Sequence, residues 1–175
     1  MSDLSRQREF EREILPQLDA AYSLARFLLR NDHDAEDAVQ EASLRAFRFF
    51  DGFRGGNARA WFLKIVRNTA YTVLQRAHAH DDNVVFDEEL HTPAAAQPLA
   101  AADFDLQHDR DTVRAAIEQL PAEFREVITL RELEDCSYKE IADIAGVPIG
   151  TVMSRLSRAR TQLQQTLFKV RAEGK

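Results

Sequence analysis

One stretch of the sequence combines basic, aromatic and amide side chains at helical spacing. Residues 54–76 contain five basic residues and no acidic residue. Steps of three and four residues place one set on a single helix face: Trp61, Lys64, Asn68, Tyr71 and Gln75. Aromatic rings stack on bases, cations hold phosphates, and amides pair with base edges, so this face suits single-stranded nucleic acid. The alternative is that Trp61 packs in the core or at a domain interface.

A second segment, residues 137–163, has the layout of a helix-turn-helix. Ser137 is a candidate N-cap, Gly146 suits the turn, and the small Ala142 allows the two helices to cross closely. The polar face of the second helix carries Gly150, Ser154, Ser157, Arg158 and Thr161, flanked by Arg155 and Arg160. These groups can reach base edges and phosphates of duplex DNA. An ordinary helical hairpin with a solvated basic side is the alternative.

A third segment presents acidic and amide side chains on the outer side of a predicted helix. They are Asp34, Glu36, Asp37, Gln40 and Glu41. Acidic residues are favourable near any helix N-terminus, which is the simpler interpretation. The functional interpretation is a docking face for a protein.

Composition excludes several classes of protein. The chain has 175 residues, of which 45% are hydrophobic and 30% charged, as in globular proteins. No apolar run approaches the roughly 20 residues of a membrane span, and residues 1–9 lack the apolar core of a secretory signal. The single cysteine, Cys136, forms no disulfide framework, so we expect a reducing, cytoplasmic setting.

No catalytic or metal-binding constellation stands out. The pair His78 and His80 lacks convincing further ligands, and no serine or cysteine is arranged as a nucleophile. We therefore expect no enzymatic activity, no metal and no cofactor.

The net charge of −6 conceals an uneven distribution. Residues 77–111 hold one basic and nine acidic residues, whereas residues 147–175 hold six basic and one acidic. Two basic segments separated by acidic ones are compatible with nucleic-acid binding, or with solvated helix faces in an acidic protein.

Apolar periodicity predicts helices throughout. The first is a helix of about 18 residues with a stripe at Ile14, Leu18, Ala21, Ala25 and Leu28. The second begins after a cap within residues 31–34 and buries Val39, Ala42, Ala46 and either Phe49 or Phe50. After a glycine-rich break, the third buries Phe62, Ile65, Val66, Thr69, Ala70 and Val73.

Periodicity fades over residues 81–107, which are rich in acids and alanine, so we expect an acidic linker between two domains. The predicted fold is all-α: a domain at 1–80, the linker, and a domain at 108–175. Predicted buried positions of the second domain are Val113, Ile117, Leu120, Phe124, Val127 or Ile128, Leu133, Ile141, Ala142, Ala145, Val152, Leu156, Ala159 and Leu163.

Three motifs resemble one family when taken together. DAEDAVQEASLRAF at 34–47 resembles region 2.2 of bacterial sigma factors, and FRGGNARAWFLKIVRN at 53–68 resembles regions 2.3 and 2.4. LPAEFREV at 120–127, SYKEIA at 137–142 and GTVMSRLSRAR at 150–160 resemble region 4. With no intervening domain, the chain resembles the extracytoplasmic-function (group IV) factors of the sigma-70 superfamily.

The resemblance implies an alternative sigma factor that binds core RNA polymerase and directs promoter recognition, −10 opening and initiation. The contact with the β′ clamp coiled coil of the polymerase would involve Asp34, Glu36, Asp37, Gln40 and Glu41, and the β flap is a further implied contact on the polymerase. Candidates for the −10 element are Arg54, Trp61, Lys64, Arg67, Asn68 and Tyr71. Candidates for the −35 element are Tyr138, Thr151, Met153, Ser154, Arg155, Ser157 and Arg158. An anti-sigma factor is a further implied partner, and membrane insertion is not expected.

Two departures from the family pattern stand out. Met153 occupies a position where the family often has lysine or arginine, and Gly55 and Gly56 replace more usual polar residues. Two other functions stay open: a dimeric helix-turn-helix regulator, which would leave residues 34–76 without a role, and a decoy that sequesters an anti-sigma factor.

Overall fold

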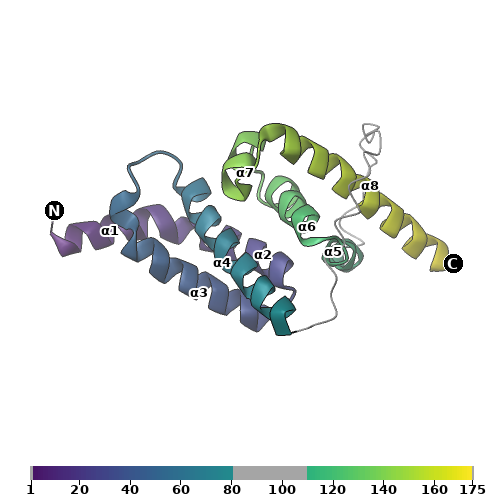
Figure 1. The fold of residues 1–175 in the computed structure, drawn as a ribbon, viewed down its shortest axis with the longest axis horizontal. Helices are drawn as coiled ribbons and strands as arrows, with labels where there is room; N and C mark the ends of the chain where they lie inside the picture. Colours follow the sequence, from purple (N-terminus) through teal and green to yellow (C-terminus); the bar gives the residue numbers. More distant parts are fainter. Residues whose placement is uncertain (1, 81–109, 175) are drawn as a thin grey trace.

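The computed structural model describes residues 2–80 and 110–174, and every regular element in these two segments is a helix. Figure 1 shows two groups of helices, one from each segment. The expected all-α class with two small helical domains is confirmed. The predicted acidic linker lies outside the described residues. No described helix is both long and apolar enough to cross a membrane.

The first group contains α1 (Asp3–Ile14), α2 (Leu18–Leu29), α3 (Asp32–Arg48) and α4 (Ala58–His80). The prediction of one continuous helix from Ile14 to Leu28 is wrong, because a 3-10 turn, η1 (Leu15–Gln17), separates α1 from α2. The turn contains Pro16, which has no N–H to donate to a carbonyl of the preceding turn.

Helix α3 packs on α2 and α4 through small side chains. Its buried residues are Ala35, Ala38, Ala42 and Ala46, so the neighbouring backbones approach closely. The predicted cap is confirmed, since Asn31 Oδ1 accepts a hydrogen bond from the Asp34 N–H at 2.9 Å. The sequence left open whether Phe49 or Phe50 is the buried aromatic residue at the end of this helix. Phe50, the first residue of the 3-10 turn η2 (Phe50–Gly52), is buried, whereas Phe49 is 61% exposed.

The glycine-rich loop before α4 requires its glycines. Gly55 and Gly56 have φ angles of +82° and +94°, which L side chains rarely adopt. Asn57 Oδ1 then accepts from the Ala60 N–H at 3.0 Å and so caps α4. The predicted inner residues of α4 are buried or half-buried, and Leu63 is buried as well.

The second group contains α5 (Arg110–Glu118), α6 (Ala122–Ile128), α7 (Tyr138–Ala145) and α8 (Ile149–Glu173). Helix α6 continues into a π-helical turn, η4 (Thr129–Leu133). The prediction that Leu133 lies on the apolar side is wrong, because its side chain is 48% exposed while Leu130 is fully buried. The π turn bonds each N–H five residues back, which shifts the apolar face away from the α-helical register.

The predicted helix-turn-helix is formed by α7 and α8. Ser137 Oγ accepts from the Glu140 N–H, and Glu140 Oε1 accepts from the Ser137 N–H, both at 3.1 Å, so the pair forms a capping box. Gly146 ends α7 with a φ of +68°. Helix α8 buries Val152, Leu156 and Ala159 as predicted and continues to Glu173.

The two groups pack directly on each other, a point that the sequence left open. Helix α4 lies against α7, and α2 lies against α6 (Figure 1). Buried residues of both groups form one hydrophobic cluster that includes Leu28 and Val66 from the first group and Ile128 and Ile141 from the second. The described chain is therefore in a closed arrangement.

Candidate nucleic-acid and protein-docking surfaces

The outer side of α3 carries a continuous acidic face. All five residues predicted for protein docking are exposed on this helix: Asp34, Glu36, Asp37, Gln40 and Glu41. Two of them have local partners: Asp37 Oδ2 lies 3.4 Å from His33 Nε2, and Glu41 Oε1 lies 2.8 Å from Arg45 Nη2. Such exposed pairs contribute little stability, so these carboxylates are available to a partner.

A shallow groove of about 440 Å³ runs beside the acidic face, between α2 and α3. Its lining combines apolar and acidic side chains: Leu18, Asp19, Tyr22, His33, Glu36, Asp37, Val39 and Gln40. Three of the five predicted docking residues belong to it. Sequence reasoning missed the contribution of Tyr22, although its spacing four residues after Leu18 places both on one side of α2.

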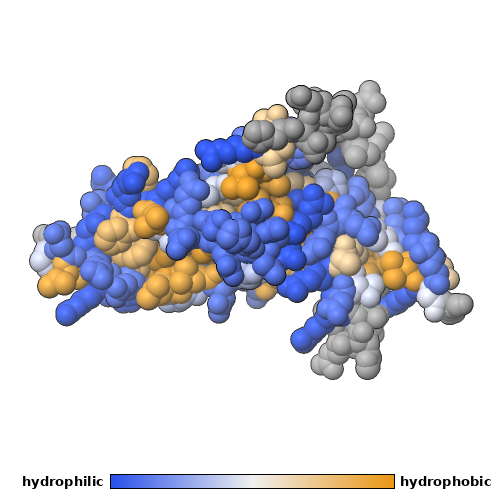
Figure 2. Space-filling model, turned by 90° about the horizontal axis from the view of Figure 1, so that it is seen from below, coloured by the Kyte–Doolittle hydropathy of each residue, from blue (hydrophilic) through white to orange (hydrophobic). Residues whose placement is uncertain are grey.

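Large hydrophobic side chains are also exposed on the first group. They include Leu4, Leu44, Phe47 and Phe49, and Figure 2 shows hydrophobic patches on this half of the molecule. Exposed apolar patches next to polar residues are typical of protein-binding surfaces.

The residues predicted to contact single-stranded DNA differ in exposure. Arg54, Lys64 and Asn68 are exposed, so their side chains can reach a ligand. Trp61 is half-buried, with its ring centroid 5.2 Å from Phe53 and 6.2 Å from Phe50. The structure therefore places Trp61 in an aromatic cluster, as the alternative interpretation anticipated, while part of its surface stays accessible.

Arg67 and Tyr71 are held by a residue of the second group, Glu126 on α6. Arg67 Nε donates to Glu126 Oε1 at 2.7 Å, and the Tyr71 hydroxyl donates to Glu126 Oε2 at 3.0 Å. The Arg67 guanidinium lies 4.0 Å from the Tyr71 ring centroid, and the Glu126 side chain is fully buried. Burial raises the pKa of Glu126, and the attraction of Arg67 opposes that rise.

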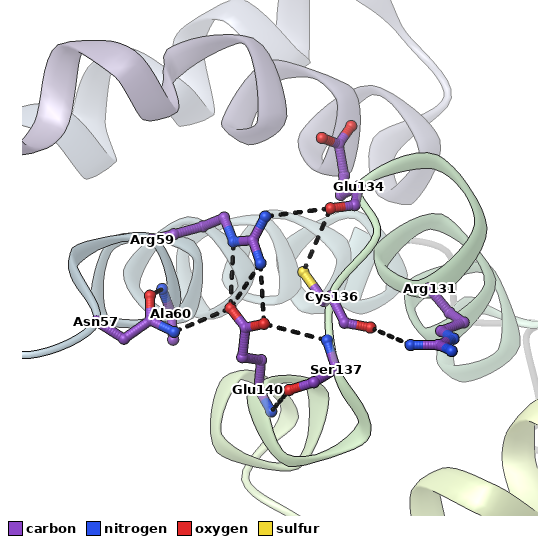
Figure 3. A network of polar contacts seen from close by, with 8 residues as sticks. All are labelled: Asn57, Arg59, Ala60, Arg131, Glu134, Cys136, Ser137 and Glu140. Carbon is purple, nitrogen blue, oxygen red and sulfur yellow. Dashed lines mark hydrogen bonds and ion pairs between the residues drawn. The ribbon is translucent and has the colours of Figure 1, made fainter.

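A second contact between the groups involves Arg59, at the start of α4. Its Nη2 donates to both carboxylate oxygens of Glu140, at 2.9 and 2.8 Å, and its Nη1 donates to the Glu134 carbonyl at 3.3 Å. Asn57 Nδ2 donates to Glu140 Oε2 at 2.9 Å. Figure 3 shows how these donors converge on one carboxylate. Burial opposes the effect, but these donors and the Ser137 N–H lower the pKa of Glu140 to about 2.

The second group presents a hollow of about 470 Å³ at the N-terminus of α8. It is lined by Glu123, Phe124, Pro148, Gly150, Thr151, Ser154, Arg155 and Arg158. Four of the seven residues predicted for duplex DNA line this hollow together: Thr151, Ser154, Arg155 and Arg158. Unpaired N–H groups at a helix N-terminus favour an anion, so the hollow suits a phosphate group.

The other three residues of that prediction lie elsewhere on the helix-turn-helix. Met153 is 53% exposed, and Ser157 is half-buried on α8. Tyr138, at the start of α7, is half-buried, with the Arg131 guanidinium 4.8 Å from its ring centroid.

Comparison with known proteins gives two family matches. The sigma-70 region 2 model matches residues 15–80, and the sigma-70 region 4 model matches residues 110–163. The chain is 40% identical over 134 residues to the ECF RNA polymerase sigma-E factor of Escherichia coli, covering 73% of this chain and 70% of that protein. It is 34% identical over 155 residues to the ECF RNA polymerase sigma factor SigE of Mycolicibacterium smegmatis, covering 89% of this chain but 60% of that relative's length.

Two solved structures are similar in fold. The sigma factor RpoE of Bartonella quintana, crystallised with the anti-sigma factor NepR, has a TM-score of 0.69 and 34% identity. The match covers 91% of this chain and 97% of that one. CnrH, in complex with the cytosolic domain of CnrY, has a TM-score of 0.65 at 23% identity, covering 93% of this chain and 90% of that one, and this likeness concerns the fold alone.

Proposed function

The chain belongs to the ECF RNA polymerase sigma factors of the sigma-70 family, and from this premise we propose that it binds core RNA polymerase and directs it to promoters. The observation that carries the proposal is the presence of three chemically different surfaces on one chain: the acidic face of α3, the basic and aromatic face of α4, and the α7–α8 helix-turn-helix. A binding factor needs these surfaces and no catalytic residues of its own.

The acidic face of α3 is the proposed polymerase-docking surface. Exposed Asp34, Glu36, Asp37, Gln40 and Glu41 support this role, because an array of one charge sign steers and orients a partner of the opposite sign. The neighbouring groove adds apolar area at Leu18 and Val39. From the family resemblance, we assign this surface to the β′ clamp coiled coil and give the second domain the contact with the β flap.

The face of α4 is the proposed −10 surface. Lys64 and Asn68 are exposed and one helical turn apart, so a cation and an amide are available to the same strand. Arg54 stands in the loop that leads into the helix. Arg67 and Tyr71 join this surface only when they are released from Glu126.

The hollow at the start of α8 is the proposed −35 surface. The helix N-terminus favours a phosphate, and Arg155 and Arg158 add positive charge beside it. Thr151 and Ser154 supply short polar side chains that can approach base edges. Arg155 Nε lies 3.9 Å from Glu123 Oε2, a loose ion pair that DNA phosphate can replace.

Residues 1–80 and 108–175 are the proposed units for the −10 and −35 elements, joined by residues 81–107. An anti-sigma factor is a proposed partner, supported by the anti-sigma factor bound to the similar RpoE of Bartonella quintana. We place the activity in the cytoplasm, where RNA polymerase transcribes the chromosome.

The test is in vitro transcription with purified core RNA polymerase over fragmented genomic DNA from the source bacterium. We expect new start sites that depend on this protein and share two spaced upstream elements. Core polymerase alone and the protein alone are the controls. Polymerase binding without initiation would indicate a decoy, and sequence-specific duplex binding in the absence of any polymerase binding would indicate a conventional helix-turn-helix regulator.

A further inference from the structure

The proposed −10 face of α4 is partly covered by the second group of helices, while Lys64 and Asn68 stay exposed. Two of its side chains, Arg67 and Tyr71, are engaged by Glu126, and Arg59 at the start of the same helix is engaged by Glu140. Both carboxylates come from α6 and α7, which lie more than fifty residues later in the chain. The contacts therefore depend on the closed arrangement and not on the local fold of α4.

The chemistry of these contacts matches that of a nucleic-acid backbone. Glu126 accepts from a guanidinium and from a phenol through its two oxygens, as a phosphate group would. Glu140 accepts from both Asn57 and Arg59. The same hydrogen-bond donors cannot bind a glutamate carboxylate and a DNA phosphate at the same time. The two acceptors therefore compete, and binding of one excludes the other.

Further contacts stabilise the same interface between the two groups of helices at its other end. Arg26 Nη1 lies 3.2 Å from Glu118 Oε1, and Arg30 Nη1 donates to the Glu118 carbonyl at 3.3 Å. The closed arrangement is thus fixed by ionic contacts to Glu118, Glu126 and Glu140, together with the shared apolar cluster.

We propose that the second domain is an intramolecular inhibitor of the −10 face, with Glu126 and Glu140 acting as phosphate mimics on α4. The free chain is closed, and single-stranded DNA binds only to the fraction that has opened. The apparent affinity for DNA is reduced by that fraction, since a binding-competent state that is rarely populated weakens binding in proportion. This inference deepens the proposed −10 role of α4 and rests on it.

The experiment compares the full chain with the double variant Glu126→Gln and Glu140→Gln. Glutamine keeps the size of both side chains, and at position 140 it can keep the capping box with Ser137. The variant removes the charge that holds Arg59 and Arg67, which leaves partly buried arginines uncompensated until the domains separate.

The control is the double variant Asp51→Asn and Glu132→Gln. It changes the net charge by the same amount but breaks pairs within one group: Arg6 Nε to Asp51 Oδ1 at 2.8 Å, and Arg160 Nη2 to Glu132 Oε1 at 2.7 Å. Any effect of global charge on DNA binding therefore appears equally in both variants.

Two readouts are taken without polymerase. Small-angle X-ray scattering should match the closed arrangement for the wild type and the control, and should show a larger radius of gyration for the Glu126 and Glu140 variant. Fluorescence anisotropy with a labelled oligothymidylate of about 20 nucleotides should show at least about fivefold tighter binding by that variant than by the control.

Two results would contradict the proposed inhibition, and each would overturn a different part of it. A wild-type chain that scatters as an extended pair of domains overturns the closure. Opening of the variant with no gain in DNA binding over the control overturns the masking of α4. Failure of the proposed sigma function itself is distinct, because it appears as absent polymerase-dependent transcription and leaves the scattering result unaffected.

Discussion

The guanidinium of Arg125, on α6, donates from Nε to the carbonyl oxygen of Phe27, near the end of α2, at 2.9 Å. Its Nη2 donates to the Leu28 carbonyl at 2.8 Å, and its Nη1 donates to the Leu120 carbonyl at 2.6 Å. The last carbonyls of a helix have no partner within it, so a side chain of the second group completes a helix of the first. Burial lowers the pKa of Arg125 to about 10, which leaves it charged at neutral pH.

Arg125→Met should therefore uncouple the two groups. Buried carbonyls lose their donor, at a cost of about 2–4 kcal/mol in the free energy of unfolding. In urea, fluorescence of the single tryptophan, Trp61, reports on the first group, and far-UV circular dichroism reports on all helices. We expect coincident transitions for the wild type and separated transitions for Arg125→Met.

Arg48→Met is the matched control, because the Arg48 side chain is exposed on α3. It should leave both transitions within about 0.5 kcal/mol of the wild type. Coincident, unshifted transitions in Arg125→Met would show that the capping contact does not couple the domains.

Local sequence signals predicted the parts of the fold that depend on neighbouring residues. Asn31 and Ser137 are caps, and Gly146 takes the left-handed conformation, because each of these roles depends on residues a few positions away. Pro16 carried a signal for the break before α2 that the apolar stripe concealed. The π turn at Thr129–Leu133 had no such signal, so the exposure of Leu133 was not predictable from helical periodicity.

The contacts between domains could not be read from the sequence. Arg67 and Tyr71 were recognised as basic and aromatic candidates, but their partner, Glu126, stands within a predicted helix with no feature that marks it as buried. A buried carboxylate depends on which helix covers it, and that information is tertiary. The same holds for Glu140, which a sequence pattern identifies as part of a capping box but not as the acceptor for Arg59.

Acid should weaken the contact between the domains through Glu140. Its pKa is lowered to about 2 from an ordinary 4.5, so its stabilising contribution is complete above 4.5 and is lost as the pH falls towards 2. The contribution is on the order of 2 kcal/mol after solvent screening. The midpoint of urea unfolding, measured from pH 5 downward, should fall less steeply for Glu140→Gln than for the wild type. Parallel plots of midpoint against pH would exclude Glu140 as a stabilising group.

The polymerase-docking role of α3 predicts a strong effect of charge reversal. Glu36→Lys with Asp37→Lys should weaken binding to core RNA polymerase more than about tenfold, because like charges facing each other across an interface cost several kcal/mol. Both side chains are exposed, so the fold should be retained. Pull-down with purified core polymerase measures the effect, and Glu9→Lys with Glu11→Lys on α1 gives the same charge change. Equal binding by the two double variants would count against α3 as the docking face.

The −10 role of α4 predicts separate effects on polymerase binding and on promoter opening. Lys64→Ala should leave core binding unchanged and lower open-complex formation by about fivefold to tenfold, since one phosphate contact is lost. Permanganate footprinting of the melted strand reports the effect. Lys169→Ala changes a lysine on the exposed end of α8 and should have no effect. An equal loss of open complexes in both variants would show that Lys64 does not contact the DNA.

Met153 gives the sharpest test of the −35 face, because adding a contact distinguishes a DNA surface from a solvated helix. Its side chain is 53% exposed on α8, and the family resemblance leads us to expect a basic residue at this position. Met153→Arg should tighten binding of the holoenzyme to promoter duplex and increase the salt dependence of log K by about one unit, as expected for one further phosphate contact. Phe168→Arg adds the same charge at a residue that is 75% exposed farther along the same helix, and it should change neither quantity. If both variants gain affinity equally, the effect is one of net charge, and the N-terminal part of α8 does not lie on the DNA.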